Sequence, residues 1–229
     1  MFREEAKKIG DILESFKKDD LNPVLEIGSS TYEFRNKIKP YIDKNIHSRL
    51  FNRGIKIILS DFKPDLDIKN PEDQIIGDVF DDKVFNKMLN AKPKCILLCN
   101  ILEHVNNPKK LCERILQISN EKTIIIVTVP FSFPYHRDPI DTLFRPSPEE
   151  LAKNFTNVEL LHKEVIEGSN FGEQLKELSF FSAFFRIIRE FAKIIVHLIT
   201  FKIKKVKYSR LLWLHKNYAV SLVVLKKIN

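Results

Sequence analysis

The chain has 229 residues, of which 44% are hydrophobic and 30% charged, and its formal net charge is +8. These values are ordinary for a folded globular protein and predict a single domain over 1–229 with a substantial core. The three cysteines, Cys95, Cys99 and Cys112, lack CxxC or CxxH spacing, which excludes a disulfide or zinc framework. The first twenty residues are charged throughout and hold no apolar signal core, so we expect a cytoplasmic protein.

The excess positive charge is concentrated late in the chain. Between Ser169 and Arg210 there are nine lysines and arginines but three glutamates, which leaves the rest nearly balanced. A groove for nucleic acid would spread basic residues over several elements, so we expect no nucleic-acid partner. A solvated basic face on one helix explains the charge equally well.

Hydrophobic periodicity predicts the elements in chain order. A stripe at Phe2, Ala6, Ile9, Leu13 and Phe16 predicts an amphipathic helix within 1–19. Further helices are expected over 33–42, from the cap Asn107 with Pro108, and from the capping box Ser147–Glu150. Short apolar runs predict strands at 23–28, 54–61, 74–79, 94–101, 122–130, 157–166 and 218–226.

Strands that alternate with helices predict an α/β fold, with a doubly wound, mostly parallel sheet covered on both faces. We divide the domain into the N-terminal helix (1–19), a core (22–166), a basic helical insert (169–210) and a terminal strand (216–227). In such sheets ligands bind beyond the carboxyl ends of the strands.

Polar residues follow several of these carboxyl ends. Glu26, Gly28 and Ser29 end the first strand, Asp61 the second, Asp78 the third, and Asn100, Glu103 and His104 the fourth. Gly28 would let a ligand approach the backbone, and Asp61 stands where such folds place a carboxylate for ribose hydroxyls. The chain has neither GxxxxGK[ST] nor GxGxxG, so a nucleoside suits these groups better than a triphosphate or a dinucleotide.

The order of these motifs resembles that of the class I methyltransferases. VLEIGSS looks like their first motif, LSDFKPDLDI and IIGDVFDD like their second and third, and LLCNILEHVNNPKKL like the LEHV segment of small bacterial enzymes. VPFSFPYHRDPIDTLFRPSPEEL is similar to the loop after the fifth strand in a subgroup associated with glycan or small-metabolite methylation. The resemblance covers 22–166 and the last strand. It implies a Rossmann-like sheet with an antiparallel last strand and a helical insert before it.

The resemblance also implies S-adenosylmethionine as the cofactor and a set of residues that bind it. Glu26, Gly28 and Ser29 would line its amino-acid and ribose side, Asp61 would bind the ribose hydroxyls, Asp78 and Val79 the adenine, and Asn100 would lie under the methionine portion. Glu103 and His104 would lie where donor and acceptor meet. Ser30 and Tyr32 stand where the family has glycines, and Lys94 where it often has an acidic residue.

Methyl transfer from a sulfonium is a direct displacement, and a hydroxyl acceptor must also lose a proton. His136 is our preferred base because histidine titrates near neutral pH. The catalytic candidates are His136, Asp141 and His104, and the predicted acceptor-binding residues are Tyr135, Arg145 and Glu103. In the structural alternative, His136 and Asp141 only pin the loop and His104 begins a helix. Asp138 and Asp141 lack a third carboxylate, so we expect no metal.

The insert is phenylalanine-rich and amphipathic. Polar residues recur at helical spacing at Ser182, Arg186, Arg189, Glu190, Lys193, His197, Thr200 and Lys204. The opposite face is apolar: Phe181, Phe184, Phe185, Ile188, Phe191, Ile195, Leu198 and Ile199. Its regular charges argue against a spanning helix. Three uses of this face stay open: packing on its own domain, a homodimer, and peripheral membrane contact through 180–205.

Together these features predict methyl transfer to an oxygen or nitrogen of a small polar metabolite or glycan-pathway intermediate, in the cytoplasm or at the inner face of the membrane. An RNA or protein methyltransferase is the alternative enzyme, but Asn100–Glu103 replaces the tetrapeptide that such enzymes carry after the fourth strand. A non-catalytic membrane-associated scaffold that keeps the fold is the alternative from another class.

Overall fold

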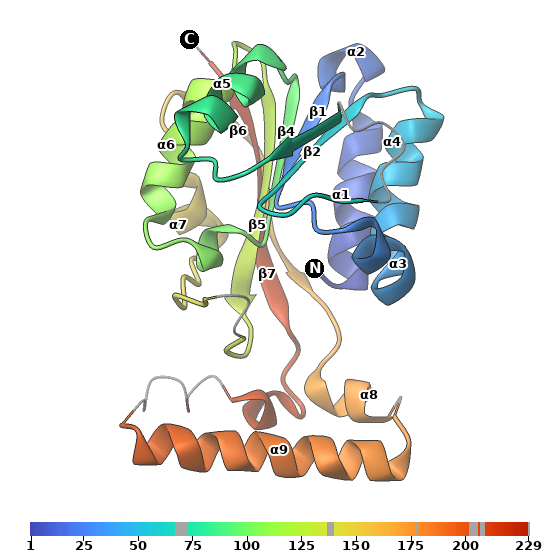
Figure 1. Ribbon diagram of the computed structural model, residues 1–229, viewed down its shortest axis with the longest axis vertical. Helices are drawn as coiled ribbons and strands as arrows, with labels where there is room; N and C mark the ends of the chain where they lie inside the picture. The colour runs from blue at the N-terminus through green and yellow to red at the C-terminus, as the bar shows by residue number, and fades with distance from the viewer. Residues whose placement is uncertain (67–72, 137–139, 177, 202–205, 207–208, 229) are drawn as a thin grey trace.

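The computed structural model describes residues 1–66, 73–136, 140–176, 178–201, 206 and 209–228. Its centre is a seven-stranded sheet in the order β3-β2-β1-β4-β5-β7-β6 (Figure 1). The strands are β1 (Val24–Ile27), β2 (Ile57–Asp61), β3 (Gln74–Ile76), β4 (Cys95–Cys99), β5 (Ile124–Ser132), β6 (Val158–Glu167) and β7 (Ala219–Lys227).

The direction of the strands confirms the predicted sheet. β1 to β5 pair in parallel, and β7 is antiparallel to both of its neighbours, β5 and β6. Because β5 and β6 both oppose β7, they run in the same direction. The carboxyl ends of β1 to β6 therefore lie at one edge of the sheet, the lower edge in Figure 1.

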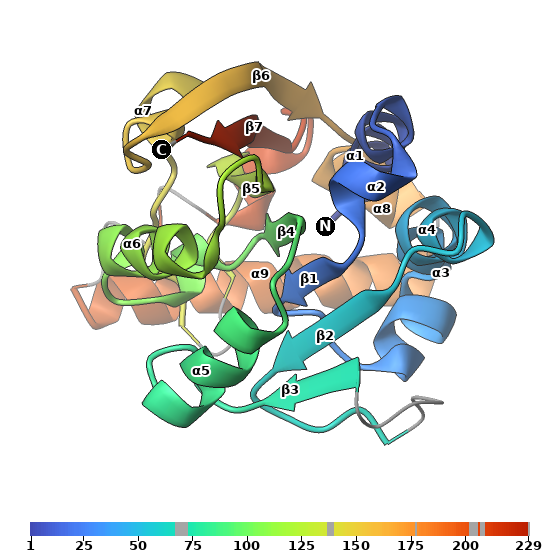
Figure 2. The same ribbon diagram turned by 90° about the horizontal axis from the view of Figure 1, so that it is seen from above.

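Helices cover both faces of the sheet, because alternate residues of its central strands are apolar on each side. On β5, Ile124 and Ile126 face one core, whereas Ile125 and Val127 face the other. The first core packs against α1 (Arg3–Ser15), α2 (Lys18–Leu21), α3 (Pro40–Ile42) and α4 (Ser48–Asn52). The second packs against α5 (Asp82–Asn90), α6 (Pro108–Ile118) and α7 (Pro148–Ala152). Figure 2 shows the two helical layers on either side of the sheet.

Several local signals act as the sequence predicts. The Asn107 side chain caps α6 by accepting from Lys110 N, and Ser147 forms its capping box with Glu150. The expected helix over 33–42 differs, because it extends to Asn52 and contains two π-helical turns, η1 (Phe34–Ile38) and η2 (Asp43–His47). Pro40 has no amide hydrogen to continue the ladder, so the helix breaks and restarts there. The sequence patterns did not predict α5, a short helix capped by Asp81.

The insert lies between β6 and β7 and leaves from the carboxyl edge. It contains α8 (Phe171–Lys176), the twenty-residue α9 (Phe180–Ile199) and a 3₁₀ turn, η5 (Arg210–Trp213). A small core of Phe171, Trp213 and Tyr218 joins α8, η5 and the start of β7. α9 runs crosswise to the strands beneath their carboxyl ends (Figures 1 and 2).

No helix in the described part of the chain is both long enough and apolar enough to cross a lipid bilayer.

Candidate active site

The turn after β1 keeps the shape of a glycine turn although it holds a single glycine. Gly28 and Ser30 both have a left-handed backbone, with φ of 76° and 60°. A Cβ on Gly28 would also lie 1.9 Å from Cδ1 of Ile101, so both backbone and packing require glycine there. Ser30 therefore adopts a backbone conformation that favours glycine.

Asp61 closes this turn. Its Oδ2 accepts a 2.9 Å hydrogen bond from Ser30 N, which joins the carboxyl ends of β1 and β2. Its Oδ1 has no donor within the described residues, and the side chain is half-buried. One carboxylate oxygen thus remains available for a hydroxyl at the carboxyl edge.

A buried arginine braces the turn from behind, which the sequence patterns did not reveal. Arg35 donates to the carbonyl oxygens of Ser29 and Ser30 and forms a 2.9 Å ion pair with Asp65. Asp65 in turn accepts from Tyr32 N. Arg35 and Asp65 together hold the backbone of the turn after β1.

Glu26 lies at the carboxyl end of β1 with 4% of its surface exposed. Its Oε2 forms a 2.6 Å ion pair with Nε2 of His47, which comes from η2. Glu26 is therefore engaged within the protein, and its predicted contact with a cofactor stays a prediction.

Asn100 follows β4 with a left-handed backbone, and its side chain meets the N-terminal helix. Asn100 Nδ2 donates to Glu5 Oε1 at 2.6 Å, and the Thr128 hydroxyl donates to the same oxygen at 2.7 Å. Glu5 is fully buried over the carboxyl ends of β4 and β5. Its position three residues after Phe2, on the apolar stripe of α1, is the signal that could have revealed it.

Asp78 and Val79 follow β3 and differ in exposure. Asp78 is exposed, and its Oδ1 accepts from Phe80 N, whereas Val79 is buried in the core. A groove of about 310 Å³ lies between α5 and α6, lined by Phe80, Asp82, Lys110, Glu113, Arg114 and Gln117. None of the predicted site residues lines this groove.

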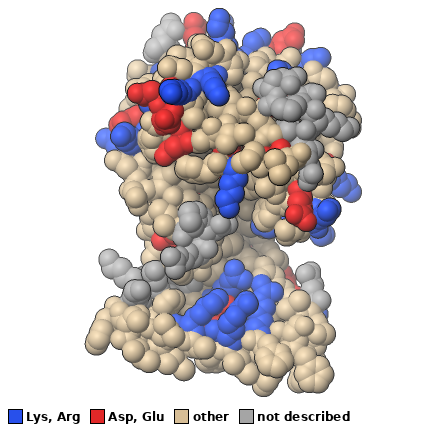
Figure 3. All heavy atoms as spheres, in the orientation of Figure 1, with Lys and Arg blue, Asp and Glu red and all other residues tan. Residues whose placement is uncertain are grey.

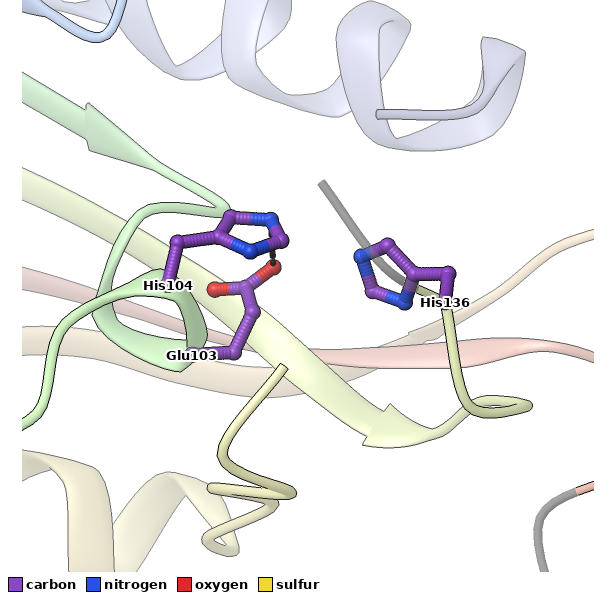
Figure 4. A group of neighbouring side chains, drawn as sticks. All are labelled: Glu103, His104 and His136. Atoms are coloured by element: carbon purple, nitrogen blue, oxygen red, sulfur yellow. Dashed lines mark ion pairs between the residues drawn. The ribbon is translucent and has the colours of Figure 1, made fainter. Parts of the chain in front are cut away.

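Three predicted residues converge beneath β4 and β5 (Figure 4). Glu103 and His104 belong to the 3₁₀ turn η4 (Leu102–His104), and His136 comes from the loop after β5. The ring centroids of the two histidines are 5.1 Å apart, and His104 Nε2 lies 3.6 Å from Glu103 Oε1. The structure thus brings together residues more than thirty positions apart in the sequence.

Hydrogen bonds orient the two imidazole rings. His104 Nδ1 donates to the carbonyl oxygen of Ile140. His136 Nδ1 lies 3.4 Å from the Pro134 carbonyl oxygen and 3.4 Å from Asp141 Oδ2. Because the Ile140 carbonyl beside His104 Nδ1 and the two oxygens beside His136 Nδ1 are all acceptors, each Nδ1 carries the hydrogen and Nε2 of each neutral ring is left as an acceptor.

Burial shifts the pKa values of Glu103 and His136 in opposite directions. Burial raises the pKa of Glu103 to about 8, and neither of its carboxylate oxygens has a hydrogen-bond donor within the described residues. Burial lowers the pKa of His136 to about 4, although the charge of Asp141 opposes this. Near neutral pH the site therefore contains a neutral imidazole beside a carboxyl group that is mostly protonated.

Asp141 organises the loop after β5. Its Oδ2 accepts from His136 N at 3.0 Å and from Arg145 Nη2 at 2.7 Å, and its Oδ1 accepts from Leu143 N. Burial acts to raise the pKa of Asp141, but the hydrogen bonds from Arg145, His136 N and Leu143 N and the charge of Arg145 together outweigh it and hold the pKa below its usual value. The Arg145 side chain is 5% exposed, so it supports the loop, and its predicted contact with an anionic acceptor stays a prediction.

The loop is also fixed to η4, because Thr142 donates through both N and Oγ1 to the Glu103 carbonyl oxygen. Tyr135 is half-buried, and its ring meets that of His197 from α9, with centroids 6.1 Å apart. The insert therefore contacts the loop that carries His136.

Glu103, His104 and His136 also offer ligand atoms within 4.8 Å of one another, so among the described residues this group could hold a cation. In the sequence, Asp138 and Asp141 are the two carboxylates considered as metal ligands, and we expect no metal there because a third carboxylate is lacking. Asp138 lies outside the described residues, and Asp141 is bound by Arg145.

The sheet order, the reversed last strand and the polar carboxyl edge define the Rossmann-like methyltransferase fold. No family model and no curated protein sequence matches this chain. Solved structures do share its fold. A SAM-dependent methyltransferase from Archaeoglobus fulgidus aligns over 99% of this chain and 95% of its own, with a TM-score of 0.55 and 15% identity.

Two further solved structures agree. Coclaurine N-methyltransferase bound to N-methylheliamine and SAH aligns over 97% of this chain and 70% of its own, with a TM-score of 0.52 and 13% identity. A putative sarcosine dimethylglycine methyltransferase from Galdieria sulphuraria aligns over 98% of this chain and 85% of its own, with a TM-score of 0.52 and 10% identity. At these identities the likeness shows the fold.

Proposed function

We propose that this chain is a methyltransferase that uses S-adenosylmethionine and acts on an oxygen or nitrogen of a small polar metabolite or glycan-pathway intermediate. The observation that carries the proposal is the cluster of Glu103, His104 and His136 beside the ends of β4 and β5. Proton-accepting groups there lie next to the strand ends that bind ligands in open α/β sheets.

The residues at the carboxyl edge fit the nucleoside part of the cofactor. Asp61 has a free, half-buried carboxylate oxygen for the ribose hydroxyls, and Asp78 has an exposed carboxylate for the adenine amine. The turn after β1, in which Gly28 and Ser30 are left-handed, brings the backbone to the same edge. Asn100, placed by Glu5, would lie under the methionine portion. When bound, the cofactor supplies a methyl group on a positively charged sulfur.

The acceptor side needs a group that takes up a proton when a hydroxyl attacks. His136 suits this role because it is neutral near pH 7 and its Nε2 has no donor among the described residues. Glu103 is the stronger base once it has lost its own proton, and His104 lies close to both. Tyr135 and Arg145 lie beside this cluster, and we assign them to binding the acceptor molecule.

The polarity of the cluster supports a small polar acceptor, because histidine, tyrosine and carboxylate groups recognise hydroxyl and amine groups by hydrogen bonds. The excess of positive charge is concentrated instead on α9 and the sequence after it. This separation supports a small acceptor over RNA, whose phosphates need basic residues along the binding groove.

Calorimetry with S-adenosylmethionine tests the proposal. We expect binding by the wild type and at least about tenfold weaker binding by Asp61→Asn, because a hydrogen bond to a charged group is lost. Glu121→Gln is the matched control, since Glu121 is exposed in the turn before β5, at the opposite edge of the sheet. If the wild type does not bind S-adenosylmethionine even at millimolar concentration, the proposed enzyme function is wrong and the non-catalytic scaffold is favoured.

A further inference from the structure

The amphipathic helix α9 is attached to the domain by its polar side. The residues of α9 that are buried or half-buried are Ala183, Arg186, Ile187, Glu190, Ile194 and His197, which form one stripe at helical spacing. Glu190 is 3% exposed and binds Lys193 Nζ at 2.6 Å. Arg186 lies over the ring of Phe171 in the small core below β7. The helix is therefore seated through a narrow, partly charged stripe.

The wide apolar side of α9 points away from the domain. Phe181, Phe185 and Ile199 are 73%, 67% and 71% exposed. The other exposed apolar residues of this side are Phe180, Phe184, Ile188, Phe191, Ile195, Val196 and Leu198. Because these side chains face outward, packing on the chain's own domain does not explain the apolar face. A continuous row of exposed aromatic and aliphatic side chains marks an interaction surface.

Positive charge borders this apolar face. The side chains of Arg189 and Lys193 are 63% and 50% exposed, and both lie beside Glu190. Figure 3 shows Lys and Arg side chains gathered on the visible face of the α9 layer, whereas its lower rim is uncharged. The sequence that follows α9 carries four more lysines between 202 and 207. Phenylalanine on one side and basic residues beside it suit a helix that lies in the surface of an anionic bilayer.

We propose that α9 docks this domain on an anionic lipid bilayer, with its phenylalanine-rich face in the interfacial region and its basic flank against the headgroups. A second copy of the chain suits the surface less well, because two docked copies would bring two basic flanks together. A bilayer complements both the apolar face and the charge. At 1.5 Å per residue, α9 would lie along about 30 Å of the surface.

Docking through α9 sets the orientation of the candidate active site. α9 lies beneath the carboxyl ends of the strands, and His197 contacts Tyr135 in the loop that carries His136. The catalytic edge would therefore face the bilayer. If the proposed function holds, on which this step rests, the acceptor group is carried on an amphiphilic molecule in that bilayer.

Vesicle flotation tests the docking without cofactor or acceptor. We expect the wild type to float with vesicles of equal parts phosphatidylcholine and phosphatidylglycerol, to bind phosphatidylcholine alone at least several-fold less, and to be released by salt. Phe181→Ser/Phe185→Ser should lose most of this binding. Phe51→Ser is the matched control, because Phe51 is 77% exposed on α4, on the flank of the domain, and should leave binding unchanged.

A separate measurement tests which side of the domain faces the bilayer. The chain has one tryptophan, Trp213, which is buried, so a new tryptophan on the surface reports its surroundings separately. We expect brominated phosphatidylglycerol to quench Phe185→Trp strongly and Phe51→Trp no more than the wild type. Equal quenching of both variants would contradict the proposed orientation.

Two outcomes would overturn the docking proposal. One is wild type that does not float with anionic vesicles. The other is a lipid-free dimer that Phe181→Ser/Phe185→Ser converts to monomer without any loss of vesicle binding, which would make the face an interface between copies. Calorimetry of the same variant with S-adenosylmethionine separates the two proposals, because loss of docking should leave cofactor binding intact.

Discussion

His47 Nε2 and Glu26 Oε2 form a buried ion pair 2.6 Å long between η2 and the carboxyl end of β1. Burial acts to lower the pKa of His47, but the charge of Glu26 and the hydrogen bonds that His47 donates to Asp43 and Glu26 outweigh it and raise the pKa to about 9. The carboxyl end of β1 is therefore paired, through Glu26, with a histidine that is charged at neutral pH. This pair fixes the helical layer to the strand that carries the Gly28 turn.

Replacement of His47 by glutamine should destabilise the protein by about 3 kcal/mol near neutral pH, because it leaves Glu26 buried without its charged partner. The wild-type contribution is fully present below pH 6.5 and is lost as pH rises through about 9. Urea unfolding of both proteins at about pH 6 and about pH 10 measures this. A difference that stays the same at both pH values would contradict the assignment.

Glu103→Gln should stabilise the folded protein in alkaline solution. The folded-state pKa of Glu103, about 8, exceeds its ordinary value of 4.5, so its ionisation costs stability as pH rises through this range. Above about pH 8 the variant should be more stable than wild type by a few kcal/mol, and near pH 4 the two should agree. Thermal unfolding across this range would show whether the difference grows with pH as expected.

The same variant has a kinetic consequence if the chain transfers methyl groups as proposed. If Glu103 and not His136 takes up the proton of the acceptor, wild-type kcat/KM should rise with pH through a single ionisation near 8, the pKa of Glu103. Glu103→Gln should lower the rate and remove that rise, because glutamine has no proton to lose. A pH profile of the variant that keeps the rise would assign the ionisation to another group.

His136→Asn should lower the rate by about a hundredfold or more near pH 7 if His136 accepts the proton. The folded-state pKa of His136 is about 4, so its contribution to stability is present above pH 6.5 and lost as pH falls through 4. Asp141→Asn serves as the comparison, because it weakens the hydrogen bonds that hold the loop but keeps the imidazole side chain of His136. Equal losses of rate in both variants would mean that His136 only holds the loop after β5 and does not accept the proton.

Gly28→Ala should destabilise the protein by about 1–3 kcal/mol, since its Cβ would meet Ile101 and its φ of 76° is strained for alanine. Ile101→Ala removes the colliding atom, so the double variant should recover part of the loss and keep the part due to strain. A double-mutant cycle followed by urea unfolding measures this coupling. Additive effects would show that packing against Ile101 is not the cause.

Much of the fold could be predicted from the sequence because its signals are local. The apolar run 122–130 and the caps at Asn107 and Ser147 depend on neighbouring residues, and the structure confirms them. The π-helical turns η1 and η2 could not be predicted in this way, because hydrophobic periodicity does not separate a π-helical turn from an α-helical one. The exposed face of α9 was also undetermined, since periodicity gives the faces of a helix and not the direction in which each points.

The candidate site was predicted residue by residue but not as an arrangement. His104 and His136 meet because Thr142 ties the loop after β5 to the carbonyl of Glu103. Arg35 and Glu5 were missed because their roles depend on long-range partners, Asp65 and Asn100. Buried charges of this kind become visible when the elements that enclose them are assembled.

The insert begins and ends at the same rung of the sheet, because Glu167 of β6 pairs with Ala219 of β7. Residues 168–218 therefore form a closed module that a tight turn could replace while β6 and β7 stay paired. Such a shortened chain would keep the seven-stranded order and the Gly28 turn. The surface that α9 presents could in this way be gained, exchanged or lost between related chains without any change in the topology that carries the catalytic edge.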